Sequence, residues 1–495
     1  MSKDNINIHL ARKWHEGTPH LSGTIFDGMK KLTSEDTQNR IRQLGDTESI
    51  IKFLKQINGF FSIVKTNGNS GWMAVDRIRS LPLFYGQYEG KLFISDDARW
   101  VREHVHDNEM DPIAREEFLA CGYVTGSDTL FPNVKQVQAG EVVFFKTGIN
   151  KAVNLKHHRY YRHNHGNFFE DDEKTIHQKY QQTLISSFER LISFANGRPL
   201  IVPLSGGYDS RLIVMMLKQL GYSDVIAFSY GKKGNKEAEI SQEVSKRLNV
   251  RWEFVPYSRD FWQHWNKRPE LKYYFQFADG LSSLPHIQNW AIQILKEESR
   301  IPKDAIVIPG HSAGSIAGEK SVNCIDIYRE FTTEDRLVSA IINYHYSLNN
   351  WRKTSKDLDS IFRGRVRSSL GALEQYYDHS SAFESWDMSE RQAKFIVNSV
   401  RIYDYLDFEW WLPYWDKEYV NFWSRIKPEL RIGKRFHIQH VNEISEQMNV
   451  NIKKNASEPP KMKQLLASVL KKTILSRYLL RKLFPNHLLR KDILA

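Results

Sequence analysis

The chain has little cysteine and no long apolar run. Two cysteines in 495 residues, Cys121 and Cys324, are too few for a disulfide framework or a cysteine-rich metal site, so we expect a reducing environment. No charge-free apolar stretch approaches the roughly 18 residues of a membrane-spanning helix. The first residues also have no continuous apolar core of signal-peptide length. The sequence therefore predicts a cytoplasmic protein that does not cross a membrane.

The positive charge of the chain is concentrated at one end. The net charge is +12, and residues 461–495 hold nine Lys or Arg against one acid, Asp492, so the rest of the chain is close to neutral. This distribution argues against a basic nucleic-acid-binding surface, and we predict no nucleic-acid partner. Within 461–495, apolar residues follow a helical spacing with lysines between them. Such a segment either lies peripherally on an anionic membrane or docks onto its own domain.

Length and local pattern predict two folded units and a tail. The chain is long enough for about two to four domains. The first third contains β-rich runs bounded by Gly, Asn and Asp, at 60–64, 72–75, 83–85, 92–95 and 142–146, with a helix near 111–121. A polar, aperiodic stretch at 156–167 indicates a linker, and we read its four histidines as linker residues with no carboxylate nearby. The predicted domains are 1–160, 170–455 and 456–495.

Strands and helices alternate after residue 198. Short apolar runs at 199–204, 225–230 and 251–255 predict buried strands, helices are expected at 211–220 and 236–248, and a later strand is expected at 305–309. This alternation predicts parallel strands joined by right-handed crossovers, with ligands at the carboxyl ends of the strands. The fold class is therefore an α/β parallel-sheet domain, preceded by an α+β domain.

The sequence SGGYDS follows the first of these strands. Its two glycines, Gly206 and Gly207, permit a sharp turn that directs backbone N–H groups toward an anion, and the following helix N-terminus adds a positive dipole end. Ser205 and Ser210 supply hydroxyl donors. Asp209 suits an anion site only when a cation is also present, so the loop predicts pyrophosphate together with Mg²⁺. The lysine of the GxxxxGK[ST] phosphate loop is missing, which excludes that class.

SGGYDS resembles the SGGxDS pyrophosphate loop of the asparagine synthase family and its ATP-pyrophosphatase (adenine nucleotide alpha hydrolase-like) relatives. GFFSIVKTNGNSGWMAVDRIRSLPLFYG and FLACGYVTGSDTLFPNVKQVQAGEVVFF resemble that family's amino-terminal glutaminase domain, and LPYWDKEYVNFWSRIKPELRIGK resembles its stretch PFLD…LPPELK…GK. The resemblance implies an N-terminal-nucleophile-like α+β domain followed by an adenylating domain.

The resemblance also implies a reaction and a set of site residues. In the family, a substrate carboxylate attacks ATP, pyrophosphate leaves, and an amine displaces AMP from the acyl-adenylate. Carried over by motif, Asp209 would bind Mg²⁺, and Lys434 would neutralise charge developing at the α-phosphate and acyl oxygen. The residues implied in binding ATP and pyrophosphate are Leu204, Ser205, Gly206, Gly207, Asp209, Ser210, Phe228, Ser229 and Gly310.

The sequence departs from the family pattern in both halves. Ser2 stands where the family has its nucleophilic cysteine, and the glutamine-binding segment is unrecognisable, so we predict no glutamine hydrolysis. In the segment IVIPGHSAGSIAGE, Gly314 replaces a second metal-binding Asp. His311 stands where a Glu is often found, as a replacement base or as a structural histidine.

Two other functions remain open at this stage. GHSAG matches the G-x-S-x-G nucleophile elbow, so Ser312, with downstream Asp and His residues, suggests an α/β-hydrolase. A catalytically weak, nucleotide-binding scaffold is the second alternative. The favoured function is ATP-dependent amide formation between a small-molecule carboxylate and an amine or ammonia. The departures suggest asparagine synthase-like proteins of surface polysaccharide assembly.

Overall fold

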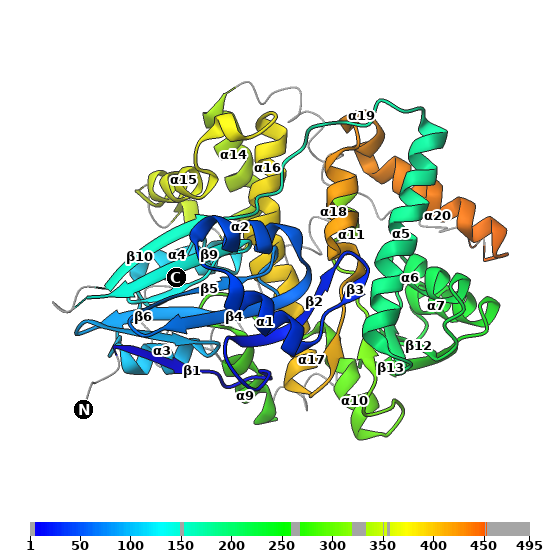
Figure 1. Ribbon diagram of the computed structural model, residues 1–495. Helices are drawn as coiled ribbons and strands as arrows, with labels where there is room; N and C mark the ends of the chain where they lie inside the picture. Colours follow the sequence, from blue (N-terminus) through cyan, green and yellow to red (C-terminus); the bar gives the residue numbers. More distant parts are fainter. Residues whose placement is uncertain are drawn as a thin grey trace.

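The computed structural model describes residues 5–148, 153–258, 268–318, 333–349, 351–353, 357–450 and 452. Two sheets form the first third of the chain, on the left in Figure 1. The larger sheet has six antiparallel strands in the order β10-β9-β5-β4-β2-β3. Their bounds are β2 (His20–Asp27), β3 (Lys30–Lys31), β4 (Asn58–Asn67), β5 (Ser70–Val75), β9 (Glu141–Thr147) and β10 (Val153–Arg159).

A second sheet and four helices complete this α+β part. The sheet order is β1-β7-β6-β8, and its strands are β1 (Ile6–His9), β6 (Phe84–Tyr88), β7 (Lys91–Ser95) and β8 (Val134–Gln136). The helices are α1 (Ser34–Gln43), α2 (Thr47–Gln56), α3 (Ala98–His104) and α4 (Pro112–Cys121). The start of α4 confirms the sequence prediction, because Asp111 caps the helix by accepting from Ala114 N–H and Pro112 occupies its first position.

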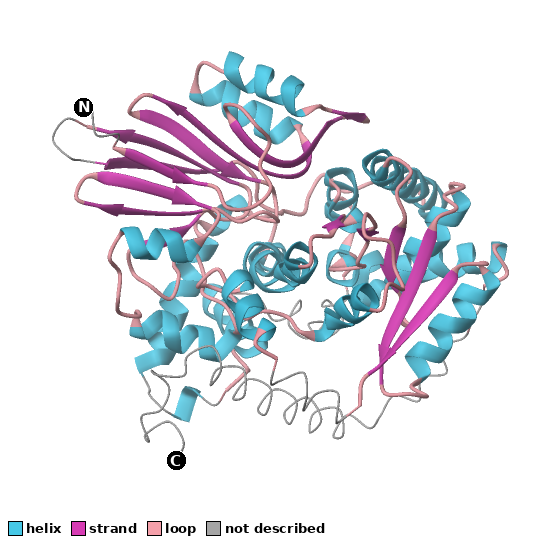
Figure 2. Ribbon diagram, turned by 90° about the horizontal axis from the view of Figure 1, so that it is seen from below, coloured by secondary structure: helices cyan, strands magenta, loops and turns pink. Residues whose placement is uncertain are grey.

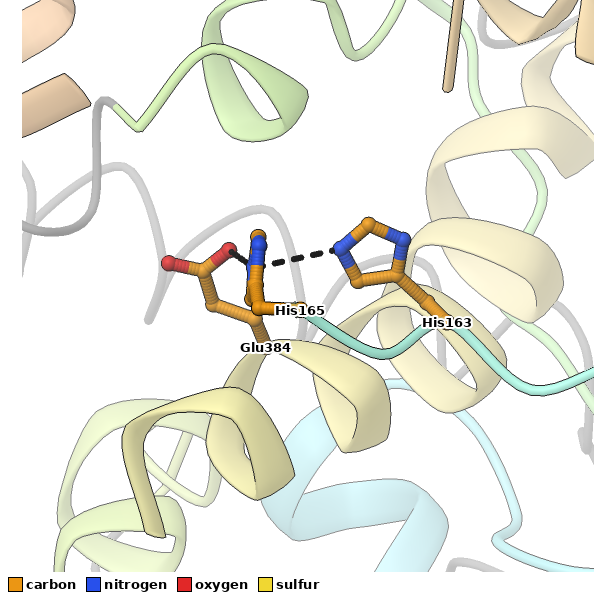
Figure 3. Close-up of side chains that lie close together, drawn as sticks. All are labelled: His163, His165 and Glu384. Atoms are coloured by element: carbon orange, nitrogen blue, oxygen red, sulfur yellow. Dashed lines mark hydrogen bonds and ion pairs between the residues drawn. The ribbon is translucent and has the colours of Figure 1, made fainter. Parts of the chain in front are cut away.

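The predicted linker is partly a strand. Residues 156–159 belong to β10, whose seven residues pair with β9. Two of its histidines are also not exposed linker residues, because His163 and His165 are buried, 3% and 7% exposed. Figure 3 shows them beside Glu384, with His165 Nε2 lying 2.8 Å from Glu384 Oε2. The expectation that no carboxylate lies near these histidines was wrong. Glu384 lies more than 200 residues further along the sequence, so the stretch around the histidines gave no sign of it.

The second half contains the predicted parallel sheet. Its order is β13-β12-β11-β14-β15 and all four neighbouring pairs are parallel. The strands are β11 (Leu200–Pro203), β12 (Val225–Gly231), β13 (Arg251–Pro256), β14 (Ile306–Val307) and β15 (Glu409–Trp410), and helices lie on both faces of the sheet (Figure 2). β11, β12 and β14 are almost wholly apolar and mostly buried, so the short apolar runs of the sequence predicted them well, whereas in β13 only Val255 is buried.

Helices surround this sheet and fill the rest of the chain. Helix α5 (Glu173–Ala195) precedes the sheet, and the connections between its strands contain α6 (Tyr208–Gln219), α7 (Lys236–Arg247), α9 (Glu270–Ala278), α10 (Ala291–Glu297) and the short α11 (Ala313–Ile316). Later come α14 (Glu334–His345), α15 (Asp357–Leu370), α16 (His379–Asp387), a π-helix (Met388–Ile396), α17 (Arg401–Tyr405), α18 (Lys417–Ser424), α19 (Pro428–Arg431) and α20 (Arg435–Gln447). In the described chain, no helix combines the length and apolarity that spanning a bilayer requires.

A buried ion pair of the second half is contacted by the first half. Arg190 on α5 is fully buried and binds Asp416 through two bonds, Nε to Oδ2 at 2.7 Å and Nη2 to Oδ1 at 2.8 Å. Asn58, which begins β4, donates to the same carboxylate at 2.9 Å. Asp416 accepts hydrogen bonds from both halves of the chain, so separating them would remove the Asn58 donor and leave Arg190 as the partner of this carboxylate.

Candidate active site

The sequence SGGYDS connects β11 to α6 at the carboxyl end of the parallel sheet. Helix α6 begins at Tyr208, so Asp209 and Ser210 lie in its first turn, three residues earlier than the predicted start at 211. Gly207 is the N-cap, and within the described chain no side chain caps this end. The first N–H groups of a helix have no partner inside the helix, so this end of α6 can donate to an anion.

The two glycines act differently from the expectation. Neither Gly206 nor Gly207 has a positive φ, and Gly207 is extended at φ −79° and ψ 172°. Their lack of a side chain serves close packing instead. A Cβ on Gly206 would lie 3.3 Å from the Cα of Glu237, and one on Gly207 would lie 3.2 Å from Ser205 Oγ. The turn is thus made without left-handed backbone at either glycine, and the open helix end remains available to an anion.

The serines of the loop bind each other. Ser205 N–H donates to Ser210 Oγ at 3.0 Å, the two hydroxyl oxygens lie 3.1 Å apart, and Gly207 N–H donates to Ser205 Oγ at 3.2 Å. These bonds hold the loop in a compact turn. Ser205 is exposed, so its hydroxyl faces the solvent side of the site, as an anion ligand requires.

A pocket of about 270 Å³ opens over this loop. It joins the carboxyl ends of three strands to the start of α20, and its lining includes seven of the predicted site residues. The lining residues are Pro203, Ser205, Gly207, Tyr208, Asp209, Ser210, Tyr230, Asn289, Pro309, Gly310, His311 and Lys434. The structure therefore brings together Lys434 and the phosphate-loop residues, which are separated by more than 200 positions in the sequence.

Asp209 is held by partners from distant parts of the chain. His437 Nε2 lies 3.1 Å from Asp209 Oδ1, and the backbone of Gly314 also bonds this carboxylate. Burial alone would raise the pKa of Asp209, but the hydrogen bond and charge of His437, together with the charge of Lys434, hold that pKa below its ordinary value. Asp209 is thus ionised at neutral pH, in the form that binds a cation.

A hydrogen-bonded chain orients His437. This side chain is fully buried, and its Nδ1 lies 2.8 Å from the hydroxyl of Tyr180 on α5. Burial raises the pKa of Tyr180 well above its ordinary value, so the hydroxyl keeps its proton. With Nε2 protonated, His437 donates to Asp209, while its other ring nitrogen is bonded to the hydroxyl of Tyr180. His437 is therefore a positioning residue for Asp209.

Backbone strain marks two positions near the pocket. Lys434 has φ 61° and Ser312 has φ 67°, both in the left-handed region that non-glycine residues seldom adopt. Such conformations cost on the order of 1–3 kcal/mol and cluster at functional sites. Lys434 lines the pocket, and the charge of its side chain contributes to lowering the pKa of Asp209.

His311 lies in the pocket without the properties of a base. Burial lowers its pKa to about 3, with a smaller contribution from His286. A general base works best with a pKa near the working pH, so this value argues against the base role considered for His311. Both ring nitrogens lie 3.3 Å from Ser399 Oγ, which fixes the ring as a neutral wall of the pocket.

Ser312 has the strained backbone typical of a nucleophile elbow, but among the described residues its hydroxyl is not bonded to a histidine. Ser312 Oγ donates to Gln392 Oε1 at 2.8 Å, and no histidine contact to this hydroxyl exists within the described residues. His437, a downstream histidine considered for a hydrolase, is bonded to Asp209. The geometry therefore gives no support to the hydrolase alternative.

Three predicted binding residues lie behind the pocket wall. Leu204 and Phe228 are 2% and 0% exposed, and Leu204 N–H donates to Phe228 O at 2.8 Å. The hydroxyl of Ser229 donates to Leu204 O at 2.7 Å and to Ser241 Oγ at 2.6 Å. These side chains support the phosphate loop, and their direct contact with adenine stays a prediction. Gly310 is close to the loop, since a Cβ there would lie 3.2 Å from Ser210 N.

The donor set fits Mg²⁺ and a triphosphate. An open helix end and two serine hydroxyls suit phosphate oxygens, and Asp209 is a single carboxylate of the kind that holds Mg²⁺ jointly with phosphates and water. Gly314 contributes a backbone group at Asp209 instead of the second carboxylate. Residues of this chain can therefore hold one cation, with much of its coordination left to phosphate and water.

Sequence reasoning missed several of these neighbours. Asn289 lines the pocket and its Oδ1 accepts from the hydroxyl of Tyr230 at 3.1 Å, and Tyr414 donates from its hydroxyl to Asp209 O at 2.6 Å. No local pattern could have paired Tyr414 or His437 with Asp209.

Comparison with protein families gives two matches. Residues 21–161 match the family described as "Glutamine amidotransferase domain", and residues 199–267 match "Queuosine biosynthesis protein QueC". The first match covers most of the two N-terminal sheets. The second covers β11, the phosphate loop, α6, β12, α7 and β13. The QueC-type match thus lies on the segment that forms one side of the pocket.

Among curated proteins, the "Microcin J25-processing protein McjC" of Escherichia coli is 22% identical over 318 residues, covering 62% of this chain and 56% of the relative. The chain thus spans little more than half the length of this relative. Among solved structures, an NH3-dependent NAD synthetase from Campylobacter jejuni has 15% identity over 39% of this chain and 93% of its own, with a TM-score of 0.21. A glutamine phosphoribosylpyrophosphate amidotransferase from B. subtilis has 11% identity over 52% and 74%, with a TM-score of 0.22. Scores this low do not establish a shared fold.

The order of the two family matches agrees with the order expected from the sequence motifs. An amidotransferase-type domain precedes a QueC-type domain that carries the phosphate loop. Together with the McjC match, this order bears out the resemblance seen in the motifs. In its domain composition and domain order, the chain is thus consistent with the asparagine synthase-like family that its motifs resemble.

Proposed function

We propose that the chain is an ATP-dependent ligase that activates a carboxylate as an acyl-adenylate and joins it to an amine or ammonia. The observation that carries this proposal is the pocket in which the open N-terminus of α6, the ionised Asp209 and Lys434 converge. An amine cannot expel oxide from a carboxylate, but it can expel AMP. A site that binds pyrophosphate beside a cation is what such activation requires.

Each residue has a role in this proposal. The N–H groups at the start of α6 and the hydroxyls of Ser205 and Ser210 bind the departing pyrophosphate, and Asp209 holds Mg²⁺. The bound Mg²⁺ supplies neutralisation of phosphate charge. Lys434 stabilises negative charge at the α-phosphate and acyl oxygen. His437 keeps the carboxylate of Asp209 oriented toward the pocket.

We further propose that nitrogen does not come from glutamine within this chain. The match to the amidotransferase family begins at residue 21 and leaves out Ser2, which lies outside the described residues. The donor would then be free ammonia or the amine of a second substrate.

The substrate class is the finer part of the proposal. The sequence departures suggest sugar acids or amino sugars as in surface polysaccharide assembly, whereas McjC is named for the processing of microcin J25. A panel of carboxylates should therefore include aspartate, uronic acids and the microcin J25 precursor.

The test is ATP–pyrophosphate exchange across this panel. Exchange that depends on one carboxylate supports the proposal, and Asp209→Asn should reduce it to background. Asp224→Asn is the matched control, because Asp224 is an exposed acid that precedes β12 at the opposite edge of the sheet. Unchanged exchange in Asp209→Asn would contradict the assigned role of this loop.

A nucleotide-binding scaffold is the second candidate. The replacement of the family's second acid by Gly314 favours the scaffold function, because Asp209 is then the single carboxylate that holds the cation. Magnesium-dependent ATP binding without exchange for any carboxylate, and without AMP formation when amines are added, would establish this alternative.

A further inference from the structure

A cluster of two histidines and one glutamate lies outside the pocket, between α5 and α20. His177 comes from α5, and His440 and Glu443 lie one turn apart on α20. His177 Nδ1 lies 3.4 Å from His440 Nδ1 and 4.0 Å from Glu443 Oε2. The three donor atoms all lie within 4.8 Å of one another. The cluster connects helices whose facing sides also carry Tyr180 and His437.

The separation of the donors matches that of ligands on a zinc ion. Zn–N bonds of about 2.0–2.1 Å in a tetrahedral site place two nitrogens about 3.3 Å apart. The two Nδ1 atoms are already at that separation. Glu443 is 46% exposed on its side chain, so its carboxylate can move the short remaining distance toward the histidines. Two imidazoles and one carboxylate also leave a position for water, as in open zinc sites.

Hydrogen bonds around the cluster prepare the donors for a cation. His440 Nε2 donates to Gln181 Oε1 at 2.9 Å, which leaves the lone pair of Nδ1 directed at His177. Metal-binding histidines nearly always donate their other ring nitrogen to such an oxygen. Gln439 donates to the second oxygen of Glu443 at 3.1 Å. The ring of His177 is fixed by stacking on Phe436, at 3.9 Å between ring centres.

The other histidine cluster of the chain differs in charge. His163, His165 and Glu384 have a similar spacing (Figure 3), but the guanidinium of Arg431 binds Glu384 and lies 2.9 Å from His165 Nε2. A divalent ion there would face a buried positive charge, so Arg431 takes the cation's place. In the part of the chain that the structure describes, no lysine or arginine bonds to the α5–α20 cluster.

We propose that His177, His440 and Glu443 bind one divalent transition-metal ion of the Zn²⁺ class. Imidazole ligands suit zinc, copper and nickel, whereas Mg²⁺ prefers oxygen donors, so this site differs from the one at Asp209. The ion clamps α20 against α5. Because His437 lies three residues before His440 on the same helix, the clamp also fixes the helix that orients Asp209.

The test uses the full chain, free of affinity tags and stripped with a chelator. Co²⁺ titrated into the wild type should give the visible absorption of a four-coordinate Co²⁺ ion, with one equivalent bound. Zn²⁺ should displace this Co²⁺ and abolish the absorption. His177→Gln and Glu443→Gln should each weaken this binding by at least about tenfold, and Gln181→Leu by about 10- to 100-fold. Glu189→Gln is the control, since Glu189 is an exposed acid on α5 three turns from the cluster.

A second measurement separates the site from adventitious binding by other histidines. One equivalent of Zn²⁺ should raise the Tm of the wild type and of Glu189→Gln, but not that of Glu443→Gln. Because Glu443 is half exposed, its variant keeps the fold, which circular dichroism verifies. Equal Co²⁺ spectra and equal Zn²⁺ shifts in all variants would overturn the proposal, as would the lack of a four-coordinate spectrum in the wild type.

Discussion

Replacing His437 by phenylalanine tests whether the position of Asp209 depends on a residue more than 200 positions away. The side chain is fully buried and donates to Asp209 Oδ1 over 3.1 Å, while its Nδ1 lies 2.8 Å from the hydroxyl of Tyr180. Phenylalanine keeps an aromatic ring but removes both bonds. A hydrogen bond to a charged group contributes about 1.5–3 kcal/mol. Since about 1.4 kcal/mol is tenfold in rate, we expect exchange to fall by about 10- to 150-fold.

The pH dependence of exchange distinguishes a positioning role of His437 from a merely structural one, because a merely structural role would not shift this dependence. In the wild type the folded-state pKa of Asp209 lies below its ordinary value of 3.8, so its ionisation stabilises the fold above that pH and the stabilisation is lost as pH falls through the folded pKa. Without His437, the hydrogen bond and charge that counter the effect of burial on Asp209 are lost, so the pKa of Asp209 rises. The acid limb of exchange activity should therefore move to higher pH in His437→Phe.

The matched variant is His437→Gln, which keeps a side-chain N–H donor. It should recover part of the activity and return the acid limb toward that of the wild type. The assay is ATP–pyrophosphate exchange from acid to neutral pH, with circular dichroism to verify folding. A folded His437→Phe protein with wild-type exchange and an unmoved acid limb would refute the positioning role.

Three further predictions concern other parts of the molecule. Glu384→Gln breaks a buried pair with Arg431 and should lower the free energy of unfolding by about 3–5 kcal/mol in urea titrations, whereas Glu243→Gln, in an exposed pair, should change it by less than about 1 kcal/mol. A loss of similar size in both variants would argue against the buried ion pair. Purified protein with millimolar glutamine should release no glutamate, and measurable release would show that a nucleophile is present. Residues 461–495 lie outside the described residues, and we propose that they bind anionic vesicles; flotation should be lost on their deletion, and unchanged flotation would exclude this role.

The parallel sheet could be predicted because its signal is local. Apolar runs such as those of β11 and β12 are buried on both faces, and the residues that interrupt them mark the turns. The start of α6 was placed too late because Tyr208, Asp209 and Ser210 were assigned to a loop by their polarity. Asp209 and Ser210 are common near helix N-termini, where the dipole and free N–H groups favour them.

The candidate site was predictable only on its strand–loop side. Ser205 and Gly310 lie just after β11 and β14, Asp209 lies in the first turn of the helix that follows β11, and parallel strands bring their carboxyl ends together. Lys434 entered through a motif, since an isolated lysine has no distinctive pattern. His437 and Tyr180 meet because α20 packs against α5, and that packing depends on tertiary contacts that no sequence window contains.

The bond network at Asp416 has a consequence for how this chain could be divided or recombined. Arg190 and Asp416 both belong to the second half, and they are contacted from the first half by Met29 and Asn58 respectively. The second half produced alone would expose this ion pair to water, and a first half taken from a relative would have to supply side chains that cover it. The two halves are therefore not interchangeable modules: they should melt in a single transition, and grafting one onto a foreign partner will require moving these contacts along with it.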